Sequence, residues 1–313
     1  MAGPTEDSVA KLSDELLGWV SQVAGGRLED VESLHLEAGR DSGSFHIRMA
    51  GGGFTDLVLK VPVPEWIGPR MVATNARALE LAAEFGLSAP RLVAADLDGR
   101  ALGTVATLET WLPGSSALPP VVSETRLRNA GAALAKVHAI PGPGHKHLRI
   151  RPRPVADDDF AADRREGRMP TTELLQHADE TTRKHGVPTG DQVFLHGDAW
   201  PGNMLFEGET CAALIDWKTA GVGDPGVDLC GFRLQMAIQY GPEAPDEVLN
   251  GWQEQAGREA RSVAYWDAIA ALNTPTELKG FPGFTTDGRR LDTAAVTQRR
   301  DAFLRTARDG LTT

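Results

Sequence analysis

Three polar residues near the middle of the chain have the types and the spacing that phosphoryl transfer requires: Asp198, Asn203 and Asp216. The first two lie in the segment HGDAWPGN (196–203), and the third lies in IDW (215–217) after an apolar run. Phosphoryl transfer needs a carboxylate that accepts or orients the proton of the attacking hydroxyl, and hard oxygen ligands that hold Mg²⁺ against the phosphate oxygens. Two aspartates and one asparagine supply both kinds of group.

The residues around these three predict a short strand, a loop and a hairpin. Apolar runs at 193–195, 204–206 and 211–215 are typical of strands. The Gly and Pro content of 196–203 excludes helix and strand alike and indicates a loop. The sequence EGET at 207–210 suits the tight turn of a hairpin. We therefore expect the hairpin to bring the loop and the end of its second strand together.

The combined motif resembles that of a known family. H-G-D-x-x-x-x-N, then I-D-W and then G-D-P-x-x-D-L, is similar to the pattern of the aminoglycoside phosphotransferase family, which shares the protein-kinase-like fold. Trp217 stands where kinases carry Phe. The resemblance implies that Asp198 is the base or hydroxyl orienter, and that Asn203 and Asp216 bind the metal. The alternative is that each of these side chains only stabilises a turn.

Lys60 is the first candidate for binding the nucleotide phosphates. It lies in the apolar strand LVLKV (57–61), where an ammonium group is costly unless it meets a negative charge. A phosphate would supply that charge. By resemblance, Lys60 corresponds to the third-strand lysine of kinases, which reaches the α and β phosphates. The alternative is an edge-strand lysine that blocks aggregation.

A segment rich in glycine and serine is the second phosphate-binding candidate. Strands are expected at 31–36 and 45–49, and the segment EAGRDSGSF (37–45) joins them. The backbone amides of such a loop can fold over phosphates, which makes Gly43 and Ser44 candidate nucleotide-binding residues.

The predicted helix at 71–85 departs from the family pattern. Kinase-like folds place here a glutamate that pairs with the lysine, but the G-L-x-x-P turn that follows the helix aligns Asn75 with that position. Glu80, the nearest downstream carboxylate, would face about 140° away at ~100° per residue. Either Asn75 is a neutral partner of Lys60, or the alignment is shifted.

A boundary between two parts of the chain is expected near residue 112. Strands at 91–95 and 103–108 complete a sheet of five, and ETWLPG (109–114) ends in a Pro-Gly linker. The resemblance implies that this linker is the hinge between two lobes, with backbone groups near Glu109 and Trp111 binding the adenine edge.

Helical periodicity and capping residues predict the remaining elements. One amphipathic helix is expected from Val9, after the capping segment TEDS, to Gly25. His138 at the end of the second helix is read as structural. Asp224 is read as a helix N-cap, and by resemblance Asp228 braces the catalytic loop. The helices of the second part are expected at 123–138, 171–185, 224–240, 245–272 and 292–309.

Two further sets of residues have two interpretations each. The acidic residues at 157–159 would hold an amine-bearing acceptor, or they are ordinary first-turn helix acids. Trp252, Tyr265 and Trp266 would line the acceptor cleft, or they pack in the core, as large aromatic residues more often do.

Composition excludes several classes of protein. With 43 acidic and 32 basic residues the net charge is −11, which disfavours nucleic acid as a partner and would suit a cationic small molecule. Two cysteines rule out a disulfide scaffold and fit a reducing cytoplasm. The polar N-terminus is unlike a signal peptide, and no apolar run reaches the ~18 residues of a membrane span.

These observations predict a bilobal, protein-kinase-like α+β fold. A nucleotide-binding lobe with a five-stranded antiparallel sheet is expected at 1–112, and a mainly helical catalytic and acceptor-binding lobe at 113–313. The expected reaction is ATP-dependent, Mg²⁺-assisted phosphorylation of a small-molecule hydroxyl, with GTP as the alternative nucleotide. The short segment 217–222 favours small acceptors over proteins. A regulatory nucleotide-binding protein and a nucleotidyltransferase remain as alternatives, and the sequence leaves the oligomeric state open.

Overall fold

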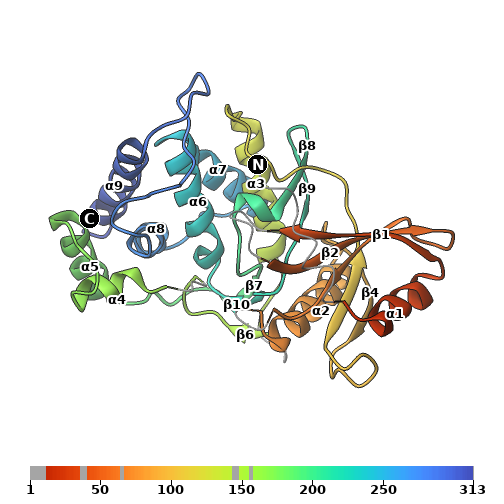
Figure 1. Ribbon diagram of the computed structural model, residues 1–313. Coiled ribbons are helices and arrows are strands. Elements are labelled where there is room, and N and C mark those ends of the chain that lie inside the picture. The colour runs from red at the N-terminus through yellow and green to blue at the C-terminus, as the bar shows by residue number, and fades with distance from the viewer. Residues whose placement is uncertain (1–11, 36–40, 64–66, 143–147, 155–157, 313) are drawn as a thin grey trace. The chain divides into compact units, whose positions relative to one another are not determined.

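The computed structural model describes residues 12–35, 41–63, 67–142, 148–154 and 158–312 (Figure 1). It divides into two compact units. The first comprises Met1–Pro113 together with Ile215–Thr219, and the second comprises Gly114–Leu214 and Ala220–Thr313. The segment that contains Asp216 thus groups with the first unit, although hairpin residues of the second unit precede it directly in the chain.

The first unit is built on a five-stranded antiparallel sheet, as predicted. Its strand order is β1-β2-β3-β5-β4, so β3 is the middle strand. Its elements are α1 (Asp14–Ala24), β1 (Arg27–His35), β2 (Asp41–Ala50), β3 (Asp56–Lys60), α2 (Pro69–Glu84), β4 (Leu92–Asp96) and β5 (Ala106–Thr110).

The two faces of this sheet have different roles because side chains alternate along each strand. One face forms an apolar core with α1. Its buried residues include Phe45 and Ile47 of β2, Leu57 and Leu59 of β3, and Leu108 of β5. The residues between them point to the opposite face, which is where the polar residues of β2, β3 and β5 gather.

Helix α1 begins later than the sequence predicted. The Ser13 side chain accepts a hydrogen bond from the backbone N–H of Leu16 at 3.2 Å, so the helix begins at Asp14. The predicted capping segment at 5–8 lies outside the described residues. The helix ends at Gly25, whose φ of 67° is left-handed, as is common after a helix.

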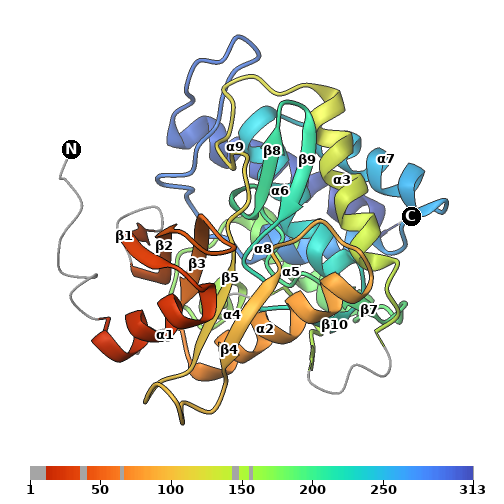
Figure 2. The same cartoon turned by 90° about the vertical axis from the view of Figure 1, so that its right-hand side faces the viewer.

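The second unit is mainly helical, as predicted, with two small sheets. Figure 2 shows the β8–β9 hairpin beside α3. Its elements are α3 (Glu124–His138), β6 (Arg149–Ile150), α4 (Phe160–Arg165), α5 (Glu173–His185), β7 (Val193–Leu195), the 3₁₀ helix η3 (Pro201–Asn203), β8 (Met204–Glu207), β9 (Thr210–Leu214), β10 (Gly221–Gly223), α6 (Gly226–Tyr240), α7 (Ala244–Ala256), α8 (Val263–Leu272) and α9 (Thr293–Gly310).

Several predicted helix starts are confirmed, and one predicted helix is wrong in extent. The side chains of Ser123 and Thr172 cap α3 and α5 by accepting hydrogen bonds from the backbone N–H groups of the first turns. The segment at 245–272 is two helices rather than one, because the chain takes a left-handed conformation at Gly257 (φ 64°) and α7 ends there.

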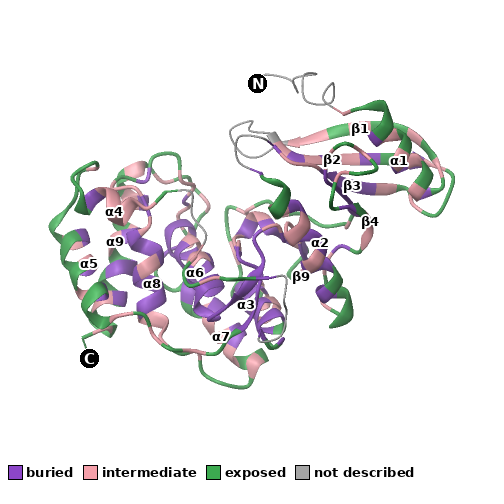
Figure 3. Cartoon of the chain, turned by 90° about the horizontal axis from the view of Figure 1, so that it is seen from below, coloured by how far each residue is buried: buried purple, intermediate pink, exposed green. Residues whose placement is uncertain are grey.

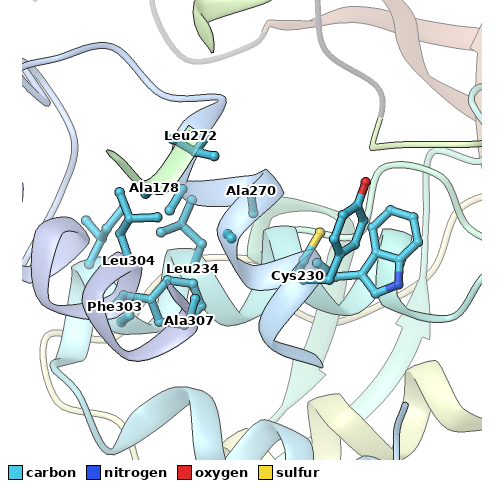
Figure 4. Packing of buried hydrophobic residues seen from close by; sticks show 14 of the residues in the cluster. Ala178, Cys230, Leu234, Ala270, Leu272, Phe303, Leu304 and Ala307 are labelled. Atoms are coloured by element: carbon cyan, nitrogen blue, oxygen red, sulfur yellow. The ribbon is translucent and has the colours of Figure 1, made fainter. Parts of the chain in front are cut away.

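Helices α5, α6, α8 and α9 enclose the main core of the second unit. Leu234 of α6 and Leu304 of α9 belong to it, and Figure 4 shows both among the packed apolar side chains. Figure 3 shows these helices buried along the faces that meet. Trp252, Tyr265 and Trp266 are buried, which favours the core interpretation of Trp252 and Trp266, while Tyr265 also borders a cavity described below.

Glycines allow α3 and α7 to pack closely. A Cβ atom at Gly131 of α3 would overlap the carbonyl oxygen of Val248, and one at Gly251 of α7 would overlap that of Arg128. This close packing fixes the positions of the two residues, His138 and Trp252, that support the candidate site described below. None of the helices in the described ranges has both the length and the apolar character of a membrane span.

Candidate active site

Lys60 lies at the end of the middle strand of the sheet and is buried. Its Nζ lies 3.0 Å from Glu109 Oε1, 3.3 Å from Asp216 Oδ1 and 3.3 Å from Asn75 Oδ1. The edge-strand interpretation of this lysine is therefore wrong, because β3 pairs with a strand on each side.

Asn75 is the neutral partner of Lys60 that the sequence left open. It is fully buried on α2, and its Oδ1 accepts hydrogen bonds from Lys60 Nζ (3.3 Å) and from the backbone N–H of Trp217 (3.1 Å). Its Nδ2 donates to Glu109 Oε2 at 3.0 Å. One amide therefore links α2, β3, β5 and the segment after β9.

The carboxylate that pairs with Lys60 comes from a residue whose side chain the sequence analysis did not consider. Only backbone groups near Glu109 and Trp111 were expected to matter, but the Glu109 side chain is 2% exposed and forms the ion pair. Strand alternation could have indicated it, since its neighbour Leu108 faces the apolar core. Trp111 donates its backbone N–H to Asp56 O (3.3 Å) and stacks on His46, with ring centroids 4.0 Å apart.

Asp216 lies against two lysines and has an unusual backbone conformation. Its Oδ1 faces Lys60, its Oδ2 contacts Lys218, and its φ of 64° is left-handed, which is uncommon outside glycine. Burial would raise the pKa of Asp216, but the charges of Lys60 and Lys218 outweigh it and hold that pKa well below its ordinary value. The carboxylate is therefore ionised at neutral pH.

Lys60 is correspondingly held as a cation. Burial would lower the pKa of Lys60, but the charges of Glu109 and Asp216 outweigh the burial and raise it above the ordinary lysine value. A buried ammonium group with this pKa keeps its charge at any physiological pH.

Gly43 and Ser44 lie in strand β2 rather than in a loop, which corrects the sequence prediction for these two residues. Ser44 is the register partner of Lys60, and the carbonyl of Gly43 accepts a hydrogen bond from the backbone N–H of Val61 at 2.8 Å. The structure thus places both residues beside the lysine. The part of the expected loop at 36–40 lies outside the described residues.

The loop that carries Asp198 is held from α6, within the second unit. Asp228 accepts hydrogen bonds from the backbone N–H groups of His196 and Gly197, both at 2.8 Å. The predicted bracing role of Asp228 is thereby confirmed. Burial would raise its pKa, but its hydrogen bond with His138 and the backbone hydrogen bond from Gly197 lower it.

His138 has a more specific role than the helix-dipole contact expected from the sequence. Its Nδ1 lies 2.9 Å from Trp252 Nε1, which can only donate, so Nδ1 accepts. The proton of a neutral His138 therefore lies on Nε2, which is 3.1 Å from Asp228 Oδ2 and donates to it. The sequence holds no local signal for this connection, because it joins three helices.

Asn203 orients Asp198 and presents an oxygen. Its Nδ2 donates to the carbonyl of Asp198 at 2.9 Å and to Asp198 Oδ2 at 3.1 Å. The amide oxygen Oδ1 of Asn203 therefore points away from Asp198. In the β8–β9 ladder Met204 pairs with Leu214, so Asn203 directly precedes one residue of this pair and Asp216 follows the other by two positions.

Oxygen donors of the kind found on Asn203 and Asp216 suit Mg²⁺, which phosphate oxygens also bind. Within the described ranges, no cluster of three or more His, Cys, Asp or Glu side chains is arranged to hold a metal ion by itself. Mg²⁺ in nucleotide enzymes characteristically binds through one or two protein oxygens, and phosphates and water complete its shell. The carboxylate of Asp216 and the amide oxygen of Asn203 are each an oxygen donor of this type.

The family of the chain is shown by its sequence. Residues 35–272 match the model of the phosphotransferase enzyme family. Since this is most of the chain, the chain belongs to that family. No curated protein sequence matches it.

Solved structures support the fold assignment. A macrolide 2′-phosphotransferase from Brachybacterium faecium is 21% identical, with a TM-score of 0.59, over 84% of this chain and 99% of that one. A spectinomycin phosphotransferase in complex with ADP and spectinomycin is 14% identical (TM-score 0.55), over 83% of this chain and 84% of that one. The GDP and kanamycin complex of APH(2″)-IIIa is 16% identical (TM-score 0.57), over 94% and 99%.

The family establishes the reaction class: the chain is a phosphotransferase. Solved structures that share its fold include one in complex with ADP and one in complex with GDP. The protein-kinase-like α+β fold predicted from the motif is confirmed.

Proposed function

We propose that this chain uses ATP and Mg²⁺ to phosphorylate a hydroxyl group of a small molecule. The observation that carries the proposal is the contact between Lys60 and Asp216, which come from distant parts of the sequence. It offers a cation for phosphate oxygens beside an ionised oxygen ligand for a divalent metal, and phosphoryl transfer uses both.

The proposed roles follow from the chemistry of each side chain. Lys60 binds phosphate oxygens, and Gly43 and Ser44, beside it on β2, provide the second phosphate contact. Asn203 and Asp216 bind Mg²⁺, which when bound neutralises the charge on the β and γ phosphates. Asp198 accepts or orients the proton of the attacking hydroxyl.

The nucleotide base is assigned to residues 109–111. Because the N–H of Trp111 is engaged by Asp56, its carbonyl is the group proposed to contact the base. ATP is the proposed donor and GTP the alternative, since ADP is bound to one relative and GDP to another. A nucleotide-consuming enzyme with two free thiols, Cys211 and Cys230, fits a reducing cytoplasm.

A cavity of about 370 Å³ in the second unit is the proposed acceptor pocket. This volume is within the range of small-molecule sites. Its polar wall holds the ion pair of Arg165 with Asp179, and its apolar wall includes Tyr265 and Ile269. Asp159 also lines it, but its carboxylate caps α4 and pairs with Arg153 at 2.8 Å, so the interpretation as a helix acid is favoured over amine binding.

Filling this cavity tests the acceptor assignment. We expect Ile269→Trp to raise the KM for the acceptor about 10-fold or more with unchanged nucleotide affinity, because a bulkier wall excludes the acceptor. Val121→Trp, at an exposed site away from the cavity, is the control. An acceptor KM equal to that of the parent would remove the cavity from the proposal.

Two other functions of the same fold are separated by product mass. A nucleotidyltransferase would add a nucleotidyl group to the acceptor, and a regulatory nucleotide-binding protein would add nothing. Asn75 alone favoured the second alternative, and its place as a partner of Lys60 removes that reason.

The direct test is a screen of hydroxyl compounds for ATP consumption, followed by mass spectrometry of the products. The compounds should include aminoglycosides, macrolides, sugars and amino alcohols. The expected result is the mass gain of one phosphoryl group on at least one compound, dependent on Mg²⁺. Transfer of a nucleotidyl group, or turnover that persists in excess chelator, would contradict the proposal.

A further inference from the structure

The buried charge of Lys60 needs a carboxylate that holds it in place, and helix α2 supplies none. The acidic residues of α2 are Glu80 and Glu84, and both are exposed. Glu80 instead pairs with Arg77 on the same helix, at 2.8 Å. The residue of α2 that does reach Lys60 is the neutral Asn75.

Glu109 meets the requirement from a different element. Both of its oxygens are used: Oε1 lies 3.0 Å from Lys60 Nζ, and Oε2 accepts from Asn75 Nδ2 at 3.0 Å. Its register partner on β3 is Val58, two residues before Lys60, so the two charged side chains leave the same face of adjacent strands. The ion pair is therefore fixed by the register of the sheet.

We propose that Glu109 is the residue that positions Lys60 for the nucleotide phosphates, with Asn75 as a fixed link between this pair and Trp217. The inference rests on the proposed function. Its consequence is that the lysine is oriented by a neighbouring strand of its own sheet, so binding of the phosphates does not depend on a charge carried by α2.

The arrangement allows a swap that moves the negative charge while keeping every hydrogen bond. In Asn75→Asp/Glu109→Gln, the carboxylate lies at position 75 and the amide at position 109. The new carboxylate at position 75 still accepts from Lys60 and Trp217. The new amide at position 109 donates to position 75, where the carboxylate of Glu109 formerly accepted. Each single change leaves a mismatch. In Glu109→Gln, the new amide N–H₂ faces either the N–H₂ of Asn75 or the ammonium of Lys60, so two donors meet. In Asn75→Asp, the new carboxylate faces that of Glu109.

The first measurement is the dissociation constant of a fluorescent ATP analogue with Mg²⁺, taken well below each variant's melting temperature. We expect Glu109→Gln to weaken binding about 10-fold or more, because a charged hydrogen bond to Lys60 is lost. We expect the swap to restore the affinity to within about 3-fold of the parent. Glu80→Gln, which removes an exposed carboxylate from the same unit, is the control and should bind as the parent does.

These outcomes separate positioning from mere structural support. If Glu109→Gln lowers the melting temperature but binds the nucleotide as the parent does, or if the swap stays as weak as the single change, the proposal is overturned. The proposed function can fail in a different way, in which the parent itself binds neither ATP nor GTP. Melting temperatures would then decide whether Glu109 holds Lys60. A melting temperature that falls in each single variant and recovers in the double variant supports the pairing. Single variants that melt at the temperature of the parent overturn it.

Discussion

The role proposed for Asp198, which is to take up the proton of an attacking hydroxyl, requires a carboxylate that is held in one orientation. Asn203 holds it by donating an amide hydrogen to Asp198 Oδ2 at 3.1 Å. We expect Asp198→Ala to reduce turnover by roughly 10²-fold or more, with little change in nucleotide affinity. Steady-state kinetics and a nucleotide titration measure the two effects.

The control for this prediction is Asp191→Ala. Asp191 is a half-exposed carboxylate that pairs with Arg258 at 3.2 Å, and its loss should leave turnover as in the parent. Turnover in Asp198→Ala equal to that of the parent would remove this residue from the reaction.

Asp216 has a different role, and its removal should have a different signature. We expect Asp216→Asn to weaken binding of the Mg²⁺–nucleotide complex itself, because the amide has no charge for the metal. Asparagine tolerates the left-handed conformation found here, so the backbone should be undisturbed. Calorimetric titration of nucleotide with and without Mg²⁺ measures the effect, and a metal dependence like the parent's would exclude Asp216 as a ligand.

Residue types and spacing made Asp198, Asn203 and Asp216 candidates, because motifs within one stretch can be recognised without coordinates. The role of Glu109 could not be predicted this way. It depends on which residues of β3 and β5 are register partners, and on Asn75 replacing a charge at a position on a third element. Strand alternation could place the Glu109 side chain on the face opposite Leu108, but its pairing with Lys60 depends on the register of β3 and β5.

At the scale of elements, the loop that carries Asp198 depends on α6. We expect Asp228→Asn to lower the free energy of unfolding by about 2–3 kcal/mol, because one of the two backbone N–H groups of His196 and Gly197 would face the amide nitrogen, which cannot accept a hydrogen bond. Turnover should fall as well, since the loop carries Asp198. Urea unfolding, monitored by circular dichroism, measures the first effect.

Glu277→Gln is a suitable control for Asp228→Asn, because it removes a carboxylate of the second unit that is exposed and paired with the exposed Lys279. A surface pair of this kind contributes little to stability. If Asp228→Asn were as stable and as active as this control, the bracing of the loop by α6 would have no energetic consequence.

The elements that sequence predicted well are those with local signals. Ser123 and Thr172 cap α3 and α5, and a Gly-containing turn closes the β8–β9 hairpin. Strands β6 and β10 were missed because they are two and three residues long and pair with each other across a long stretch of chain. No periodic pattern can be recognised in so few residues.

At the scale of the whole molecule, the assignment of Ile215–Thr219 to the first unit could not be predicted from local pattern. The segment directly follows β9 of the second unit in the chain. Its contacts with the first unit include the bonds of Asp216 to Lys60 and of the Trp217 backbone to Asn75. Such contacts between residues distant in the sequence become evident only with coordinates.

Acid sensitivity is expected in both units, because each holds carboxylates whose pKa is lowered. Burial opposes the shift in Asp228, but His138 and backbone N–H groups lower its pKa. Burial also opposes it in Asp96, where the backbone N–H groups of Gly99, Ala101 and Leu102 lower the pKa. In Asp159 the hydrogen bond from Arg153 is the main cause. A carboxylate whose pKa is lowered in the folded state stabilises the fold at any pH above its pKa in the unfolded chain, which is about 3.8. This contribution is lost as the pH falls through the pKa of the folded state.

We therefore expect the urea midpoint of unfolding to stay nearly constant from about pH 7 to about pH 5 and to fall steeply below about pH 4, as these carboxylates become protonated. Asp228→Asn should show a shallower fall, because it has already lost the group that titrates, whereas Glu277→Gln should follow the parent. Midpoints measured by tryptophan fluorescence across this range would test the expectation. A parent midpoint that does not change below pH 4, or a variant with the same slope as the parent, would mean that Asp228 contributes no acid-sensitive stability and that the loop is held mainly by other contacts.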